Sequence, residues 1–363
     1  MRMNLRKERA LLVDGPASVA LTSGSATVLG TSIKEGPRTV VRNGKRLPFE
    51  AVTEATFELT MGEASAFLEI DGPATPDSWR RAVDDILELT GPISVIVLGG
   101  VDSGKTSFCT YLANRAIDSS RKVSLIDGDL GQSDISSPAT IGLARLEEPV
   151  VDLFEVEADS IVFVGATSPP RALSACLSAF ATLKERCASI DSGLLIVNTD
   201  GWIEGEEAVN YKAQIVDLFS PNVIVAIQGG DELNRIVERL RDSRIVVVET
   251  PKAIKKRSRE ARKALRELCY KKYLKGAKVK SYNLNYIEIK QCHQLDDSLK
   301  GLDKDVGFLV GLEDQEGTFV GIGVLSGIDR ERGFLKVYTP VGEPSPRILL
   351  GQVRLTLGGS EIC

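Results

Sequence analysis

The sequence predicts an α/β fold in which a doubly wound parallel sheet lies between two all-β domains. The 363 residues are too many for one ordinary core. The middle of the chain alternates buried apolar runs with helix-length segments, which is the pattern of a parallel sheet covered on both faces. Each end instead carries short β-rich runs separated by glycines. We therefore expect domains at residues 1–75, 76–278 and 279–363.

The N-terminal 75 residues contain β-rich runs such as "ALLVDG", "SVALTSG", "SATVLG" and "ATFELTMG". Asn43 and Gly44 stand between two further runs and predict a tight hairpin turn there. The stretch "TPDSWRRAVDDILELTG" then predicts a connecting helix within residues 76–92, with Thr75 or Asp77 as its cap and Pro76 in its first turn.

The central domain is predicted from six strands, "ISVIVL", "VSLI", "IVFV", "LLIV", "NVIVAI" and "RIVVV". Between them lie helical segments, "KTSFCTYLANRAI", "PRALSACLSAFATLKERC", "EEAVNYKAQIVDLF" and "ELNRIVERLRD". In a doubly wound sheet, ligands bind at the carboxyl ends of the strands. Residues that directly follow these six strands are therefore the candidates for function.

A basic segment closes the central domain over residues 251–278, and "SREARKALRELCYKKYL" within it predicts a helix. From Pro251 to Lys280 there are 13 Lys or Arg against Glu260 and Glu267, a local net of +11, while the whole chain has −5. Such a run is either a solvated helix face or a surface for a polyanion. Beyond it, "SYNLNYIEIK", "GFLVGLEDQEGTFVGIGVLSGID", "GFLKVYTP" and "RILLGQVRLTL" predict a second β domain, a sandwich or a barrel.

Composition excludes several kinds of chemistry. The six cysteines contain no CxxC pair, which argues against a zinc site or a disulfide framework and favours buried, reduced thiols. The single histidine, His293, excludes most histidine-based catalysis and is itself expected to be structural. The chain has no apolar run of the roughly 18 residues that a membrane helix needs and no signal core near its start. We expect a cytoplasmic protein that does not bind a membrane.

The segment "GGVDSGKT" carries the strongest chemical signal. It satisfies the Walker A (P-loop) pattern G-x-x-x-x-G-K-[ST] between a predicted strand and a predicted helix, as that motif requires. Glycines let backbone N–H groups reach the phosphates, Lys105 reaches the β- and γ-phosphates, and Thr106 offers a hydroxyl to Mg²⁺. ATP or GTP is expected here, on Gly99, Gly100, Val101, Asp102, Ser103, Gly104, Lys105, Thr106 and Ser107.

Polar residues follow three of the other strands. In "LIDGDLGQSD", Asp127 and Asp129 lie two residues apart, on one side of an extended chain. They are suited to hold the Mg²⁺ shell together with Thr106 or to accept a proton from an attacking hydroxyl; the alternative is a plain acidic turn. Gln132 in the same loop can orient a nucleophile or a phosphate. Thr167, Ser168 and Pro169 follow a second strand, and Trp202 follows a third, where its ring is either a packing residue or a platform for a base.

At these residues the chain resembles the polynucleotide 5′-hydroxyl kinases, a family that includes archaeal RNA and DNA kinases and the kinases of pre-mRNA cleavage and pre-rRNA processing. "DGDLGQ" is similar to the family's D/E-x-D-x-G-Q, "TSP" to its clasp, "NTDGW" to its N-T-x-G-W, and "KRSREAR" to its lid motif R-S-x-x-x-R. Asp200 fills a variable family position, and Pro170 replaces the familiar glycine after the clasp.

The resemblance implies roles for these residues. Lys105 and Thr106 serve the ATP site, Asp129 is the general base for the 5′-hydroxyl, and Asp127 is a carboxylate of the Mg²⁺ shell. Gln132 and the clasp residues Thr167 to Pro169 contact the nucleic acid, Trp202 stacks on a base, and Arg257 and Arg262 lie over the triphosphate.

The leading hypothesis is a phosphotransferase that moves the γ-phosphate of ATP to the 5′-hydroxyl end of RNA, with single-stranded DNA as a further acceptor. The rival is a P-loop ATPase or GTPase switch, although the chain lacks an N-K-x-D or T-K-x-D guanine motif. A third hypothesis is an ATP-binding scaffold of an RNA-processing complex without kinase activity, with other proteins of that complex as partners. The sequence leaves open the choice of ATP or GTP, the natural RNA, the oligomeric state and the work of the β domains.

Overall fold

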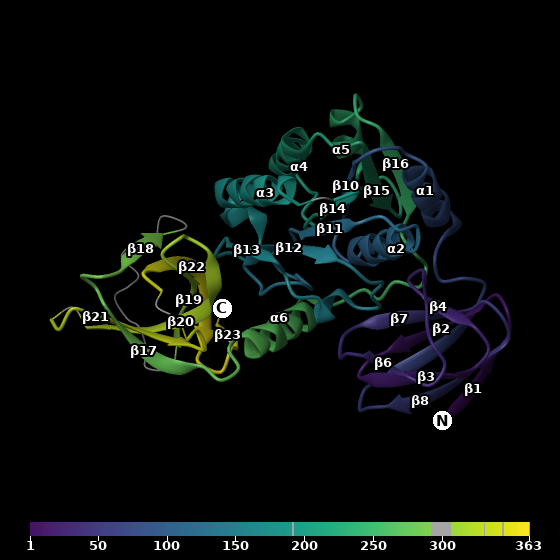
Figure 1. The fold of residues 1–363 in the computed structure, drawn as a ribbon, viewed down its shortest axis with the longest axis horizontal. Helices are drawn as coiled ribbons and strands as arrows, with labels where there is room; N and C mark the ends of the chain where they lie inside the picture. The colour runs from purple at the N-terminus through teal and green to yellow at the C-terminus, as the bar shows by residue number, and fades with distance from the viewer. Residues whose placement is uncertain (191, 292–305, 330, 343–344, 363) are drawn as a thin grey trace. The chain divides into compact units, whose positions relative to one another are not determined.

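The computed structural model (Figure 1) describes residues 1–190, 192–291, 306–329, 331–342 and 345–362. Cys292, His293 and Cys363 lie outside these residues. The chain divides into two units. The first contains Met1–Leu125, Arg145–Val156 and Asp191–Arg257, and the second contains Ile126–Ala144, Glu157–Ile190 and Ser258–Cys363. The predicted limits at residues 75 and 278 stay a prediction.

The first unit begins with two antiparallel sheets, which have the strand orders β1-β8-β3-β6 and β5-β4-β7-β2-β9. Apolar side chains from both sheets form one core; for example, Phe49 of β7 meets Phe57 of β8 edge to face, with ring centroids 5.8 Å apart. The strands are β1 Arg2–Leu5, β2 Arg9–Asp14, β3 Ala17–Ser23, β4 Ala26–Val28, β5 Thr31–Ser32, β6 Arg38–Val41, β7 Arg46–Ala51, β8 Ala55–Met61 and β9 Ala66–Asp71.

The predicted hairpin at Asn43 and Gly44 is wrong in its strand pairing. A turn does form there, since Lys45 N donates to Arg42 O at 3.1 Å and Gly44 has a φ of +75°. However, β6 pairs with β3, whereas β7 pairs with β2 and β4. The turn therefore connects the two sheets, because an Asn-Gly signal marks a change of direction and not the partners of the flanking strands.

The central sheet has the strand order β13-β12-β11-β14-β10-β15-β16. Its strands are β10 Ile93–Gly99, β11 Val123–Asp127, β12 Thr140–Leu146, β13 Ser160–Phe163, β14 Leu194–Asn198, β15 Val223–Gln228 and β16 Ile245–Glu249. All six predicted strands are present, and β10 runs parallel to β14 and β15. The sheet thus has the expected α/β character around the strand that precedes the phosphate loop.

Two details of the sheet differ from the prediction. The sequence did not reveal β12, whose "TIGLARL" contains small residues in place of a continuous β-branched run. β13 was expected to be a parallel strand but pairs antiparallel with β12, Thr140 lying opposite Phe163. Gly142 of β12 lies in close packing, because a Cβ there would be 3.2 Å from Ile135 and Ser136.

In the first unit, helix α2 packs on β10 and β14, and α1 packs on β16. In the second unit, α3 packs on β13. The helices are α1 Asp77–Leu87, α2 Lys105–Asp118, α3 Leu173–Ala188, α4 Glu206–Phe219, α5 Asn234–Arg239 and α6 Arg259–Tyr273, with short 3₁₀ turns η1 Leu153–Glu155 and η2 Pro169–Arg171. No helix within the described ranges is both long and apolar enough to span a bilayer.

The predicted cap of α1 is wrong. Pro76 occupies the N-cap position, and no side chain caps the helix. Thr75 instead donates its backbone N–H to Glu50 Oε1 at 2.7 Å. A proline at this boundary already has the φ angle that helix entry needs, so the side-chain cap is not required.

The second unit ends in a sheet with the order β17-β21-β20-β19-β22-β18, and β23 pairs with β22. "SYNLNYIEIK" forms two strands at opposite ends of this order, separated by a turn in which Tyr286 N donates to Asn283 O. Because only four residues join these strands, the sheet has to curl, as in the barrel alternative. The strands are β17 Lys278–Asn283, β18 Glu288–Gln291, β19 Val306–Glu313, β20 Phe319–Asp329, β21 Phe334–Thr339, β22 Arg347–Thr356 and β23 Glu361–Ile362.

This sheet shares a core with α6 and β13. Tyr270 and Leu274 of the helix segment and Phe163 of β13 pack with Leu309 and Val324 of the sheet. The rings of Phe163 and Phe319 are stacked with centroids 6.5 Å apart. The C-terminal strands are therefore packed against the elements that carry part of the candidate site.

Candidate nucleotide and acceptor sites

The phosphate loop joins β10 to α2 and has the backbone that its glycines predict. Asp102 and Gly104 have φ angles of +55° and +101°, so the chain bends through two left-handed positions. A Cβ on Gly99 would lie 2.4 Å from Ser103 Oγ. A Cβ on Gly104 would lie 3.2 Å from the ring of Trp79, which is itself buried. Close packing thus requires glycine at position 99, and the left-handed backbone favours it at position 104.

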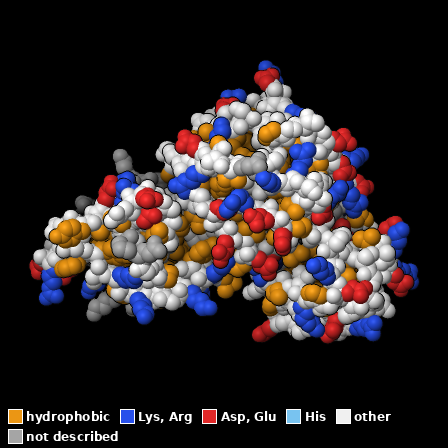
Figure 2. Space-filling model, in the orientation of Figure 1, with side chains coloured by type: hydrophobic (Ala, Val, Ile, Leu, Met, Phe, Trp, Pro, Cys, Tyr) orange, Lys and Arg blue, Asp and Glu red, His pale blue; other side chains and the backbone are white. Residues whose placement is uncertain are grey.

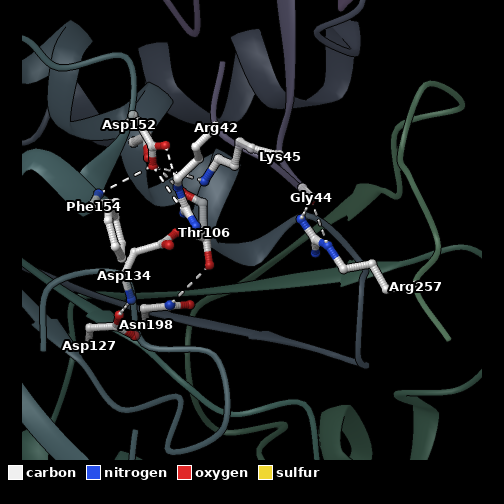
Figure 3. A network of polar contacts seen from close by, with 11 residues as sticks. Arg42, Gly44, Lys45, Thr106, Asp127, Asp134, Asp152, Phe154, Asn198 and Arg257 are labelled. Carbon is white, nitrogen blue, oxygen red and sulfur yellow. Dashed lines mark hydrogen bonds and ion pairs between the residues drawn. The ribbon is translucent and has the colours of Figure 1, made fainter. Parts of the chain in front are cut away.

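Lys105 and Thr106 begin α2 directly after this loop. The buried Lys105 donates from Nζ to the carbonyl oxygens of Gly99 and Gly100, at 2.9 Å and 2.7 Å. Asn198, at the end of β14, donates from Nδ2 to Thr106 Oγ1 at 3.4 Å (Figure 3). Sequence reasoning missed Asn198 as a site residue, although it is the first residue of the "NTDGW" motif and follows a buried strand.

A buried ion pair between Lys212 and Asp200 fixes the loop that carries Trp202. Lys212 of α4 is fully buried and donates to Asp200 Oδ2 at 2.8 Å and to Asp200 O at 3.0 Å. Asp200 Oδ1 in turn accepts from Trp202 N at 2.9 Å. The half-buried Trp202 ring lies against Tyr211, with centroids 5.8 Å apart and planes tilted by 35°. Asp200 therefore orients the tryptophan, a role that the sequence did not reveal.

Gly201 joins this loop to the phosphate loop. A Cβ on Gly201 would lie 2.7 Å from Val101 Cγ2 and 2.8 Å from Val101 Cα and N. Any side chain at this position would push against the backbone of the phosphate loop. The glycine of "NTDGW" is thus a packing requirement between two candidate site loops.

Arg257 is bound to the phosphate loop and to the turn between β6 and β7. Its backbone N and its Nη1 donate to the two carboxylate oxygens of Asp102 at 2.9 Å and 3.1 Å. Its Nε and Nη2 both donate to Gly44 O at 3.1 Å (Figure 3). Arg257 is thus placed beside the phosphate loop, and the guanidinium has two fixed partners in the first unit.

A second group of cations in the first unit surrounds Asp152 (Figure 3). Arg42 donates from Nε to Asp152 Oδ2 at 2.6 Å, and Lys45 Nζ lies 3.3 Å from Asp152 Oδ1. Asp152 also accepts from Phe154 N and so caps η1, while the Arg42 guanidinium lies 4.5 Å from the Phe154 ring centre. The sequence analysis did not single out these residues; the two cations flanking Asn43 and Gly44 were the available signal.

In the second unit, Asp127 is buried and organises the loop that follows β11. Asp127 Oδ2 accepts from Ser133 Oγ at 3.1 Å and from Asp134 N at 2.9 Å. Its Oδ1 accepts from Asp129 N at 3.3 Å. The pKa of Asp127 is raised to about 7, mainly by burial and also by the charges of Asp129 and Asp134. The Asp127 carboxyl group therefore changes its protonation state near neutral pH.

Asp129 and Gln132 lie in the same loop. Asp129 Oδ1 accepts from the backbone N–H groups of Gly131 and Gln132 at 3.1 Å and 3.0 Å, which fixes the carboxylate. Gln132 Nε2 donates to Gly131 O and, at 3.3 Å, to Arg262 O of α6. The Gln132 amide thus connects this loop to α6, a contact that sequence reasoning did not predict.

The predicted clasp lies next to this loop. A Cβ on Gly131 would be 3.0 Å from Thr167 O, so the two segments approach closely. Ser168 is extended, as a residue before proline must be, and precedes η2, which begins at Pro169 and includes Pro170. The second proline is tolerated because the first residues of a helical turn need no N–H partner. Gln352 of β22 supports this turn by donating from Nε2 to Arg171 O at 3.1 Å.

The predicted site residues therefore fall into two groups. The first unit brings together the phosphate loop, the Trp202 loop and Arg257. The second unit brings together Asp127, Asp129 and Gln132 with the clasp and with the backbone of Arg262. The face of the molecule in Figure 2 shows Lys and Arg side chains interspersed with Asp and Glu. In the basic segment, Lys255, Arg257, Lys263 and Arg266 have carboxylate partners, so its charge is partly neutralised.

A buried strand, a glycine loop with two left-handed residues and a helix that starts with Lys-Thr define the class of P-loop proteins, which bind nucleotides.

Comparison with known proteins finds a matching family model. Residues 99–276 match the family described as mRNA cleavage and polyadenylation factor CLP1 P-loop. The polyribonucleotide 5′-hydroxyl-kinase of Methanocaldococcus jannaschii is 27% identical over 79% of this chain and 94% of its own length. The polyribonucleotide 5′-hydroxyl-kinase of Pyrococcus horikoshii is 28% identical over 83% of this chain and 96% of its own length. The predicted resemblance to the polynucleotide 5′-hydroxyl kinases is confirmed.

A eukaryotic protein is similar over a larger share of the chain. The polyribonucleotide 5′-hydroxyl-kinase Clp1 of Xenopus tropicalis is 27% identical over 94% of this chain and 90% of its own. The solved structure of a wild-type Clp1p–Pcf11p complex contains a chain of similar fold, with a TM-score of 0.76, 13% identity and 97% coverage of both chains. The α/β fold with flanking β domains is thereby confirmed.

Proposed function

We propose that the protein transfers the γ-phosphate of ATP to the 5′-hydroxyl end of RNA. The observation that carries this proposal is the Asp129 loop. Its carboxylate is held by two backbone N–H groups, and the clasp lies beside it. A nucleotide switch needs the phosphate loop but has no use for a clasp. The relatives from M. jannaschii, P. horikoshii and X. tropicalis, all named polyribonucleotide 5′-hydroxyl-kinases, support the same activity.

On the donor side, residues 99–107 hold the triphosphate. Backbone N–H groups at the start of α2 favour the negative phosphates, and Lys105 adds a full positive charge next to the loop carbonyls. Arg257 supplies a second cation, already placed against Asp102. Charge that develops on the transferred group is then stabilised by groups that need little movement.

A magnesium ion fits the donor atoms of these residues. Thr106 offers a hydroxyl oxygen at the start of α2, and the buried Asp127 and the fixed Asp129 offer carboxylate oxygens, the ligand type that Mg²⁺ prefers. When bound, the ion would neutralise phosphate charge. We assign Thr106, Asp127 and Asp129 to this ion or to its water shell.

On the acceptor side, we assign Asp129 as the general base that takes the proton of the 5′-hydroxyl. A base has to be held within hydrogen-bond reach of that proton, and its fixed carboxylate meets this requirement. Thr167, Ser168 and Pro169 grip the strand near its end, and Trp202 stacks on a base. Gln132 supports the loop, and Arg262 at the start of α6 reaches the phosphates as a lid residue.

The test is a transfer assay with γ-labelled ATP, Mg²⁺ and a 5′-hydroxyl RNA oligomer. Label on the 5′ end of the RNA supports the kinase, whereas RNA-independent phosphate release alone would identify an ATPase or GTPase switch. ATP binding without either activity would identify a scaffold. Parallel arms with single-stranded DNA and with GTP decide acceptor and donor preference. Protein partners in RNA processing and the cytoplasmic location stay predictions.

A further inference from the structure

We propose that Glu361 of β23 is a positioning residue for phosphoryl transfer. Through its ion pair with Arg266 it holds the first half of α6, and through α6 it holds the Asp129 loop. This inference rests on the proposed function, since its readout is 5′-hydroxyl kinase activity. It gives the C-terminal sheet a task that neither the motifs nor the relatives' names assign.

The pair between Glu361 and Arg266 has a two-point geometry. Arg266 donates from Nε to Glu361 Oε1 at 2.6 Å and from Nη2 to Oε2 at 2.7 Å. The two side chains are only 18% and 12% exposed. Glu361 N also donates to Glu267 Oε1 at 3.0 Å, so β23 contacts two consecutive residues of α6. A bidentate pair of this kind fixes the orientation of the two side chains as well as the distance between them.

The first half of α6 depends on such polar contacts. The buried side chains of the helix are Cys269 and Tyr270, and both lie in its second half. Residues 259–266 contain no buried side chain, so this half of the helix is not anchored by a side chain in the core. Over its 15 residues the helix also carries six Lys or Arg against two Glu. Like charges on neighbouring turns repel one another, and Glu361 offsets this repulsion.

The same half of α6 contacts the Asp129 loop. Gln132 Nε2 donates to Arg262 O, one turn before Arg266, and Gln132 N donates to Asp129 Oδ1. The hydrogen bond that Arg266 donates to Glu361 is the main cause that raises the pKa of Arg266, and the charge of Asp129 adds to it. Arg266 and Asp129 therefore already act on each other electrostatically. A shift of Arg266 would move Arg262 and change the surroundings of Asp129.

The chemical consequence is a loss of kcat. A displacement of about 1 Å in a positioned group costs up to roughly 10²-fold in rate. Glu361→Gln removes the charge and one strong acceptor while it keeps the size of the side chain. Because Glu361 contacts no residue of the phosphate loop among the contacts described, the KM for ATP should stay within about twofold.

The experiment measures kcat, the KM for ATP and the KM for a 5′-hydroxyl RNA oligomer in the full chain. Thermal melting is recorded for the same preparations. We expect Glu361→Gln to lower kcat about 10- to 100-fold at saturating ATP. Glu288→Gln is the matched control, because Glu288 pairs with Arg347 in the same sheet and makes no described contact with α6. This control should keep the wild-type kcat.

A double-mutant comparison tests whether Glu361 acts through Arg266. If it does, Arg266→Met with Glu361→Gln should be no slower than Arg266→Met alone. Additive losses would overturn the inference. So would a Glu361→Gln protein with lower melting temperature but wild-type kcat in its folded fraction, because that role is structural only. Inactivity of the wild-type protein toward RNA would instead overturn the proposed function itself.

Discussion

Asp102 and Arg257 form a clamp in which a carboxylate of the phosphate loop accepts from both the backbone N–H and the guanidinium of the same arginine. The Asp102 side chain is 9% exposed and that of Arg257 is 24% exposed. The clamp places a negative charge inside a loop that is built for an anion. It is therefore expected to hold Arg257 in place at some cost in triphosphate affinity.

Replacing Asp102 with Asn should separate these two effects. Asn keeps the shape and tolerates the left-handed backbone at this position. Removing the charge reduces repulsion of the triphosphate, so ATP should bind as tightly as before or more tightly, while kcat should fall about tenfold because Arg257 is no longer fixed. Titration calorimetry and transfer kinetics measure the two quantities. Weaker ATP binding with an unchanged kcat would contradict the clamp, and the exposed Asp77→Asn is the control.

Asp129→Asn should abolish transfer while ATP binding stays nearly unchanged. Loss of a general base costs roughly 10²- to 10⁴-fold in rate, and Asn can still accept the two backbone hydrogen bonds to Oδ1. Two quantities are measured on the same protein: label transfer to RNA and the affinity for ATP. Asp242→Asn, at an exposed position, controls for the loss of a carboxylate. Full activity of the Asp129 variant would remove this residue from the role of base.

Trp202→Ala should weaken the acceptor more than ATP. Stacking of a base on an aromatic ring contributes about 1 to 3 kcal/mol, so the KM for RNA should rise about 5- to 150-fold. Trp202→Phe keeps a stacking face and should recover most of the loss. A melting temperature that falls while acceptor affinity stays the same would show that the ring serves only its contact with Tyr211.

Asp127 should make folding stability depend on pH. Burial raises its pKa from 3.8 to about 7, so between these values the folded protein binds a proton that the unfolded chain has lost. The contribution to stability is full below about pH 4 and is lost as the pH rises through about 7. Without added metal, wild type should therefore lose a few kcal/mol of unfolding free energy relative to Asp127→Asn between about pH 4 and pH 8. The measurement is chemical denaturation of both proteins over this pH range. If their unfolding free energies change with pH in the same way, Asp127 does not have the raised pKa.

The sequence predicted well where the signal is local. The phosphate loop, its strand and its helix lie within residues 93–118, and the glycine spacing alone determines most of their geometry. Six of the seven strands of the central sheet were visible as apolar runs. Asp127, Asp129 and Trp202 could be selected because each lies at the end of such a strand or within four residues of it.

Features that depend on distant partners were missed. The pairing of β6 and β7 with different sheets cannot be read from Asn43 and Gly44, because a turn does not specify its flanking ladders. The fully buried Lys212 looks in sequence like any helical lysine, and only its ion pair with Asp200 reveals its task. β12 was hidden by Gly142, which lies in close packing, and by the buried Ala144, because strand propensity disfavours both residue types.

The lack of space between Gly201 and Val101 has a thermodynamic consequence. The loop under the proposed base platform cannot move toward the phosphate loop without displacing its backbone. Occupancy of one loop should therefore be felt at the other, and linkage requires the effect to be mutual. The factor by which ATP changes RNA affinity must equal the factor by which RNA changes ATP affinity. In the first unit, donor and acceptor would then be recognised as one coupled pair.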